Sequence, residues 1–342
     1  MLVKPARLRG AVNLLDSDHT TIRRSRKEHK ATREESSMKH SLFGIGGAAV
    51  LSCLSSVAAY AHPTTATAMD STFGLPKPPV DLSYSFTNSL SASIGSVICF
   101  LVVVIVAAIN ARKTGKVLPL FVAASGILFS VVEVIIDIPG ACYWAVDNSQ
   151  VVFTILGRPM TWMPICSWLA FGAIQIYAFY SLLAKNASTK SLWICYGLMC
   201  VLDIVLEEIE LRVPGIYTYY GNQPFVFFLF PAWWMFVNAA GCFSSAALIH
   251  RFEEHLQGWK AFGVFLLAPL GYLASFAFTS VPAVIVVNGT YSWLTTQLGG
   301  LMTVLLSVLC MGLTMSVILN RYPLRGHSNS SDRMSLGAAV LR

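Results

Sequence analysis

Long apolar stretches, separated by short polar segments, dominate the chain beyond residue 90. A helix of about 20 residues is needed to cross the roughly 30 Å hydrocarbon core of a bilayer. Seven stretches reach that length, at 91–110, 117–138, 161–184, 191–210, 225–249, 261–287 and 293–319. The pattern predicts an all-α, polytopic integral membrane protein whose residues 91–319 form a bundle of seven transmembrane helices.

The first 90 residues follow a different pattern. Residues 1–37 are polar and basic with no apolar period, and we expect a disordered extension, with Met38 as an alternative start of translation. A short basic start, an apolar run and Ala59-Tyr60-Ala61 then predict a signal peptide over residues 38–61. An uncleaved signal anchor is the alternative. Both interpretations make residues 62–90 an extracytoplasmic segment.

Composition supports the membrane assignment. The chain is 55% hydrophobic and 12% charged, with a mean hydropathy of +0.62, whereas soluble domains carry about 25% charged residues. This excludes a soluble enzyme. The net charge of +7 does not indicate nucleic-acid binding, because most of the lysines and arginines lie in the N-terminal extension and in short loops. We expect membrane lipid and an apolar small molecule as partners, and no nucleic acid.

The distribution of basic residues predicts the orientation. The loops at 111–116, 185–190 and 250–260, together with the tail at 320–342, carry eleven lysines and arginines, and the alternate segments carry three. Cytoplasmic loops are the ones enriched in these residues. We therefore predict a multi-pass protein of the cell membrane or an endomembrane, with the mature N-terminus outside and the tail in the cytoplasm.

Acidic residues inside two predicted spans are the most informative positions, since each costs roughly 2.5–3.5 kcal/mol at a helix centre. Glu133 and Asp137 are four residues apart and share one helix face. Asp203, Glu207 and Glu210 form a second stripe. Both spans run outward, so the two acidic clusters are predicted at similar depth in the outer half of the bundle.

Glu133, Asp137, Asp203 and Glu207 are the predicted catalytic residues, while Glu208 is expected to point elsewhere. Polar and aromatic groups predicted at the same depth suggest a cavity open to the outer leaflet, acidic on one wall and aromatic on another. Some of these groups have structural interpretations too: the arginines as ion-pair partners of the acids, and the aromatics as an interfacial belt. The predicted substrate-binding residues are Glu210, Arg158, Arg212, Tyr219, Tyr220, Trp233, Trp234 and Asn238.

Missing residue types exclude several chemistries. Apart from His250 at a boundary, the predicted spans contain no histidine, which excludes b-type haem and histidine-rich di-iron sites. No P-loop, dinucleotide-binding fingerprint or GxSxG motif occurs in a plausible context. We predict no cofactor and no resident metal. Mg²⁺ enters only if the substrate is a diphosphate, whose head group a carboxylate-bound ion would hold.

These features favour a membrane enzyme that uses its carboxyl groups for acid–base chemistry on an isoprenoid-like or lipid substrate. A carboxylic acid in an apolar surrounding can stay protonated at neutral pH and act as a general acid. Glu133 or Asp203 would donate the proton, and Glu207 would be the counter-carboxylate. In span count and acid placement the chain is similar to the small seven-helix membrane terpene cyclases, without a shared motif, and this likeness implies cyclisation or double-bond isomerisation.

Two alternatives belong to other classes. Intramembrane carboxylates also serve proton- or cation-coupled transporters, and seven spans with an outside N-terminus are the layout of receptors. The chain has no obvious inverted repeat, and the predicted cytoplasmic loops are only about 5 to 11 residues long, too short to offer a receptor's partner much surface.

Overall fold

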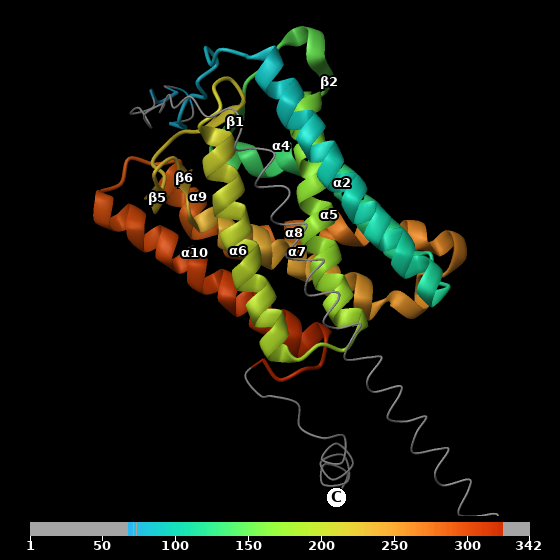
Figure 1. The fold of residues 1–342 in the computed structure, drawn as a ribbon. Helices are drawn as coiled ribbons and strands as arrows, with labels where there is room; N and C mark the ends of the chain where they lie inside the picture. The colour runs from blue at the N-terminus through green and yellow to red at the C-terminus, as the bar shows by residue number, and fades with distance from the viewer. Residues whose placement is uncertain (1–67, 71, 73, 324–342) are drawn as a thin grey trace, which may run out of the picture. The chain divides into compact units, whose positions relative to one another are not determined.

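The protein is described here from a computed structural model that covers residues 68–70, 72 and 74–323 (Figure 1). The predicted extension and the predicted signal sequence lie outside the described residues, as does the tail beyond residue 323. The described part is mostly helical. Its α-helices are α2 (Phe86–Thr114), α3 (Leu118–Ala124), α4 (Phe129–Gly140), α5 (Trp162–Ala184), α6 (Thr189–Leu211), α7 (Trp233–Arg251), α8 (Val264–Thr279), α9 (Val281–Val287) and α10 (Trp293–Leu313).

Five helical segments of the described residues are long and apolar enough to cross a membrane, which supports a multi-pass membrane protein. They are Phe86–Thr114, Leu118–Gly140, Trp162–Ala184, Gly258–Thr279 and Trp293–Ile318. The predicted count of seven is not confirmed, because α6 and α7 do not meet the same limits. Helix α6 carries one basic and four acidic residues. Helix α7 begins at Trp233, eight residues later than predicted, because the chain before it forms a short hairpin.

The burial of α6 and α7 explains why their composition differs from that of the other helices. On α6, Ile194, Leu198, Val201 and Val205 form an exposed apolar face, while Asp203 and Glu208 are buried. Helix α7 packs against α5, α6, α8 and α10, and most of its residues are buried. A helix surrounded by protein has less need of an apolar surface than one surrounded by lipid.

Two of the predicted spans are interrupted. The stretch predicted at 117–138 is divided by a 3₁₀ turn at Ser125–Leu128, where the backbone of Gly126 lies directly against α5. A Cβ at Gly126 would be 2.7 Å from the carbonyl oxygen of Leu169, so only glycine permits this approach. The stretch predicted at 261–287 begins with a 3₁₀ turn and breaks again at Ser280, where Pro282 lies in the first turn of α9.

Helices α2, α7 and α10 begin at the end of the bundle where α4, α6 and α9 end. At this end Asn88 Nδ2 donates to Pro214 O at 2.9 Å, and Asn222 N donates to Val287 O at 3.0 Å. At the opposite end Lys116 pairs with Glu253 at 2.7 Å. We name the first end the hairpin end, because the paired strands β1–β4 and β2–β3 lie there. Basic-residue counts predict that it is the non-cytoplasmic end.

The all-α prediction needs one correction, since three two-stranded antiparallel sheets connect the helices. Aromatic and β-branched residues are common in these strands, and such residues favour extended backbone. The register of β1 against β4 sets Cys142 opposite Tyr219 and Trp144 opposite Tyr217. The strands are β1 (Cys142–Trp144), β2 (Val151–Ile155), β3 (Arg158–Thr161), β4 (Tyr217–Tyr219), β5 (Val226–Phe227) and β6 (Phe230–Pro231).

Candidate functional site: buried carboxyl groups beneath strands β1 and β4

Helices α4 and α6 direct acidic side chains into the interior near the hairpin end. Glu133, Asp137 and Asp203 are 3%, 6% and 1% exposed, and Glu207 is partly buried. Glu133 and Glu207 are linked through two stacked rings, because Trp144 donates to Glu133 and Tyr217, which stacks on Trp144, donates to Glu207. Asp203 and Glu207 are one helical turn apart on α6. The carboxyl groups of the two helices therefore belong to one cluster, which we call the acid cluster.

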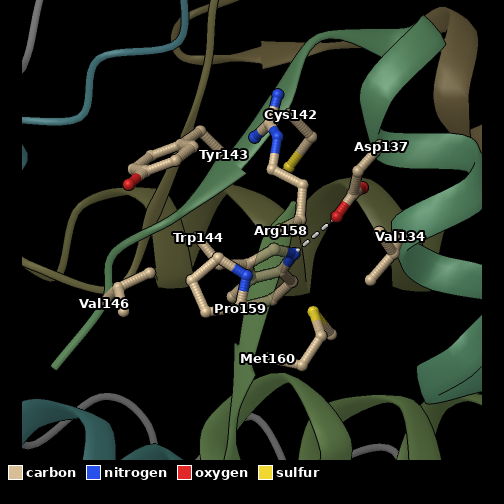
Figure 2. A pocket seen from close by; sticks show the side chains of 9 residues that line it. All are labelled: Val134, Asp137, Cys142, Tyr143, Trp144, Val146, Arg158, Pro159 and Met160. Atoms are coloured by element: carbon tan, nitrogen blue, oxygen red, sulfur yellow. Dashed lines mark hydrogen bonds between the residues drawn. The ribbon is translucent and has the colours of Figure 1, made fainter. Parts of the chain in front are cut away.

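Glu133 and Asp137 form a linked pair within the acid cluster. The indole N–H of Trp144 lies 3.0 Å from Asp137 Oδ2 (Figure 2) and 2.8 Å from Glu133 Oε1, and it donates to both. Two carboxyl groups that share one site favour a proton on one of them, because two adjacent negative charges repel each other. Glu133 Oε2 has no hydrogen-bond partner among the described residues, so it is the oxygen available to carry a proton.

Glu207 has the opposite surroundings. Its Oε2 accepts hydrogen bonds from the phenols of Tyr217 and Tyr219. Burial, and after it the neighbouring Glu207 charge, raises the pKa of both tyrosines well above the ordinary value. The two phenols therefore stay protonated and remain donors. Two donors on one oxygen stabilise an ionised carboxylate.

The β1–β4 sheet places these donors. Residues directly opposite each other in an antiparallel pair project to the same face, and Trp144 and Tyr217 stack with ring centroids 4.4 Å apart. Cys142 and Tyr219 are the next pair on that face. One short sheet thus supplies the donor to the Glu133–Asp137 pair and both donors to Glu207.

Asp203 is held by a different set of groups. Asn238 Nδ2 on α7 donates to Asp203 Oδ2 at 3.1 Å, and the hydroxyl of Tyr272 on α8 donates to Asn238 Oδ1 at 2.5 Å. Asp203 Oδ1 is buried and has no hydrogen-bond partner among the described residues. The predicted residue Asn238 therefore orients an acid of the cluster directly.

The two predicted arginines do not form ion pairs with the acid cluster in the part of the chain that the structure describes. Arg212 pairs with Glu208 at 2.8 Å. Glu208 Oε1 also accepts from the backbone N–H groups of Leu229 and Phe230, so this carboxylate anchors the β5–β6 turn. Arg158 donates to the hydroxyl of Tyr220 at 2.7 Å and lies over the ring of Tyr143.

The two predicted tryptophans have different surroundings, and one of them has a structural role. Trp233 is fully buried, and its indole N–H donates to Gln223 Oε1 at 3.0 Å, which is a structural role. Trp234 stacks on Trp233 and Phe276, and its ring lies 6.1 Å from that of Tyr219. Its indole N–H has no partner among the described residues.

Glu210 has no hydrogen bond or ion pair from its side chain within the described part of the chain. It is partly buried on the same stripe of α6. We therefore place it at the margin of the acid cluster and assign it no role.

The space that the structure shows beside the acid cluster is small. A cavity of about 10 Å³ is lined by Asp137, Cys142, Tyr143, Trp144, Arg158 and Met160 among others (Figure 2). That volume admits about one water molecule. The wide cavity open to the outer leaflet stays a prediction.

Sequence reasoning missed three residues that contact the acid cluster or its partners: Trp144, Tyr217 and Tyr272. Trp144 lies just beyond a predicted helix end, and nothing local shows that the chain folds back over the acids. Tyr217 lies in a run of three tyrosines at 217–220, and such a run by itself favours an interfacial aromatic belt. Tyr272 lies on α8 in the middle of an apolar stretch. The one feature that could have indicated its role is a hydroxyl group at a position predicted to be buried.

No group of three or more histidine, cysteine, aspartate or glutamate side chains within the described residues is arranged to hold a metal ion. Comparison with protein-family models, with curated proteins and with solved structures finds no match for this chain.

Proposed function

We propose that this protein is an integral membrane enzyme that carries out acid–base chemistry on an apolar, isoprenoid-like or lipid substrate, by cyclisation or double-bond isomerisation. The observation that carries the proposal is the contrast between two carboxyl environments in one cluster. The Glu133–Asp137 pair shares one indole donor, whereas Glu207 accepts from two phenols.

Such a contrast provides a proton donor and a proton acceptor without a metal or nucleotide. In the proposed reaction the O–H bond of Glu133 breaks, and its proton adds to a carbon of the substrate double bond. The resulting carbocation loses a proton from another carbon to Glu207, and a new double bond forms. The faces of Trp144, Tyr217 and Tyr219 stabilise positive charge on the way.

The small cavity sets a condition on this mechanism. An isoprenoid is far larger than the roughly 10 Å³ beside Asp137, so its entry requires side chains of the site to move. Trp234 is the best candidate to move, because its indole N–H has no partner whose hydrogen bond would be broken.

The direct test supplies polyprenyl alcohols and diphosphates to the full-length protein in lipid nanodiscs and identifies products by mass spectrometry. We expect new hydrocarbon or alcohol products that Glu133→Gln and Glu207→Gln abolish. Glu254→Gln, at an exposed position of the opposite end, is the matched control and should keep full activity. Absence of any product with folded protein across these substrates would refute the proposal.

A proton-coupled transporter is the second candidate, and the water-sized cavity favours it, since protons reach an acid through a space that excludes lipids. Proton uptake in proteoliposomes, driven by a solute gradient and without chemical change of the solute, would establish that function instead. Glu133→Gln would abolish the uptake.

A further inference from the structure

We propose that Asp137 is the proton-relay residue that reloads Glu133 from water at the hairpin end, through the cavity between Arg158, Trp144 and Cys142. The proposal rests on the proposed use of Glu133 as proton donor, and it assigns the two members of the acid pair different tasks.

The geometry separates the two carboxyl groups by depth. Asp137 lines the cavity, whereas Glu133, one helical turn earlier on α4, does not (Figure 2). Trp144, Val146 and Arg158 at the rim are half-buried, while Cys142 and Met160 are buried. A water molecule in this space therefore meets Asp137 before any other acid of the cluster.

The transfer from Asp137 to Glu133 uses contacts already present. Glu133 and Asp137 are one helical turn apart on α4, and Trp144 Nε1 lies within 3.0 Å of one oxygen of each. A hydronium ion gives its proton to the Asp137 carboxylate and leaves as water. The Asp137 O–H then passes its proton to ionised Glu133, which restores the Asp137 carboxylate.

The groups around the Glu133–Asp137 pair favour proton movement from the rim of the cavity toward Glu133. Arg158 on β3 brings a positive charge to the cavity that Asp137 lines, and a positive charge near a carboxyl group favours its ionised form. The Cys142 thiol on β1 lines the same cavity, and burial raises the pKa of this thiol, so it stays neutral.

The test follows hydrogen–deuterium exchange of the protonated carboxyl group by infrared spectroscopy, on full-length protein in nanodiscs without substrate. Glu133→Gln identifies the band of Glu133, which D₂O shifts to lower frequency. Asp137→Asn should slow this shift about tenfold or more, which corresponds to an added barrier of about 1.4 kcal/mol. Asp137→Glu should restore fast exchange, which separates the relay from a general effect on folding.

A second pair of variants tests the route. Val146→Phe would narrow the cavity at its rim and should slow exchange, whereas Val152→Phe, on an exposed position of β2 outside the cavity, should not. Unchanged exchange in Asp137→Asn or in Val146→Phe would overturn the proposal, as would equal slowing in Val152→Phe. Expected exchange kinetics without any product would refute the proposed enzyme and leave the proton route standing.

Discussion

The indole N–H of Trp144 is a donor shared by Glu133 and Asp137, at 2.8 and 3.0 Å. Trp144→Phe keeps a ring that can stack on Tyr217 and removes this donor. A hydrogen bond to a charged or strongly polar group contributes about 1.5–3 kcal/mol. Because Trp144 orients the proton donor and its partner, we expect the loss to appear in the reaction barrier, as a fall in kcat of about 10-fold to 100-fold.

The assay compares Trp144→Phe with Trp193→Phe under the same conditions. Trp193 is the matched control, because its indole N–H donates to Pro323 O at 2.9 Å, at the opposite end of the bundle. Each variant loses one indole N–H donor, so the two should lose similar amounts of stability. Only Trp144→Phe should lower kcat and change the infrared band of Glu133. Equal effects of the two variants on kcat, or an unchanged band in Trp144→Phe, would refute the reasoning.

Three further predictions concern packing, pH and metal. Gly140→Ala places a Cβ 2.1 Å from Trp234 Cζ2 and should lower stability by about 1–3 kcal/mol in unfolding measurements, whereas Gly197→Ala, with no atom within 4 Å, should not. Because the pKa of Tyr217 is raised, wild-type activity should show no alkaline loss from this phenol up to about pH 10; a loss near pH 9 that Tyr217→Phe removes would contradict this. EDTA should leave activity within about twofold, and a loss that Mg²⁺ restores would establish a diphosphate-binding metal.

The five helical segments that are long and apolar enough to cross a membrane were predictable because lipid imposes a simple rule on them. A chain surrounded by hydrocarbon must satisfy its backbone within helices and present apolar side chains outward. The breaks inside two predicted spans were not predictable from apolar length. The break at Ser125–Leu128 depends on the close approach of Gly126 to the neighbouring helix α5. The break at Ser280 depends on how Pro282 is placed in the first turn of α9.

The candidate site also has parts that could be predicted from the sequence and parts that could not. The spacing of Glu133 and Asp137, and of Asp203 and Glu207, places each pair on one helix face, because the helical period determines it. The sequence alone therefore located the acids and predicted that they meet near one surface. It did not locate their donors, since the register of β1 against β4 decides that Trp144 and Tyr217 lie over the acids.

What the sequence determined by itself is the membrane character, the helical segments and the buried acids, all of which follow from local composition and period. Only the tertiary structure decided the protonation chemistry that we infer and the size of the space beside it. Both depend on which donors reach which oxygen, and on whether aromatic rings leave a hollow or fill it. Those are distances between α4, the β1–β4 sheet and α6, which lie far apart in the sequence, and no local pattern encodes them.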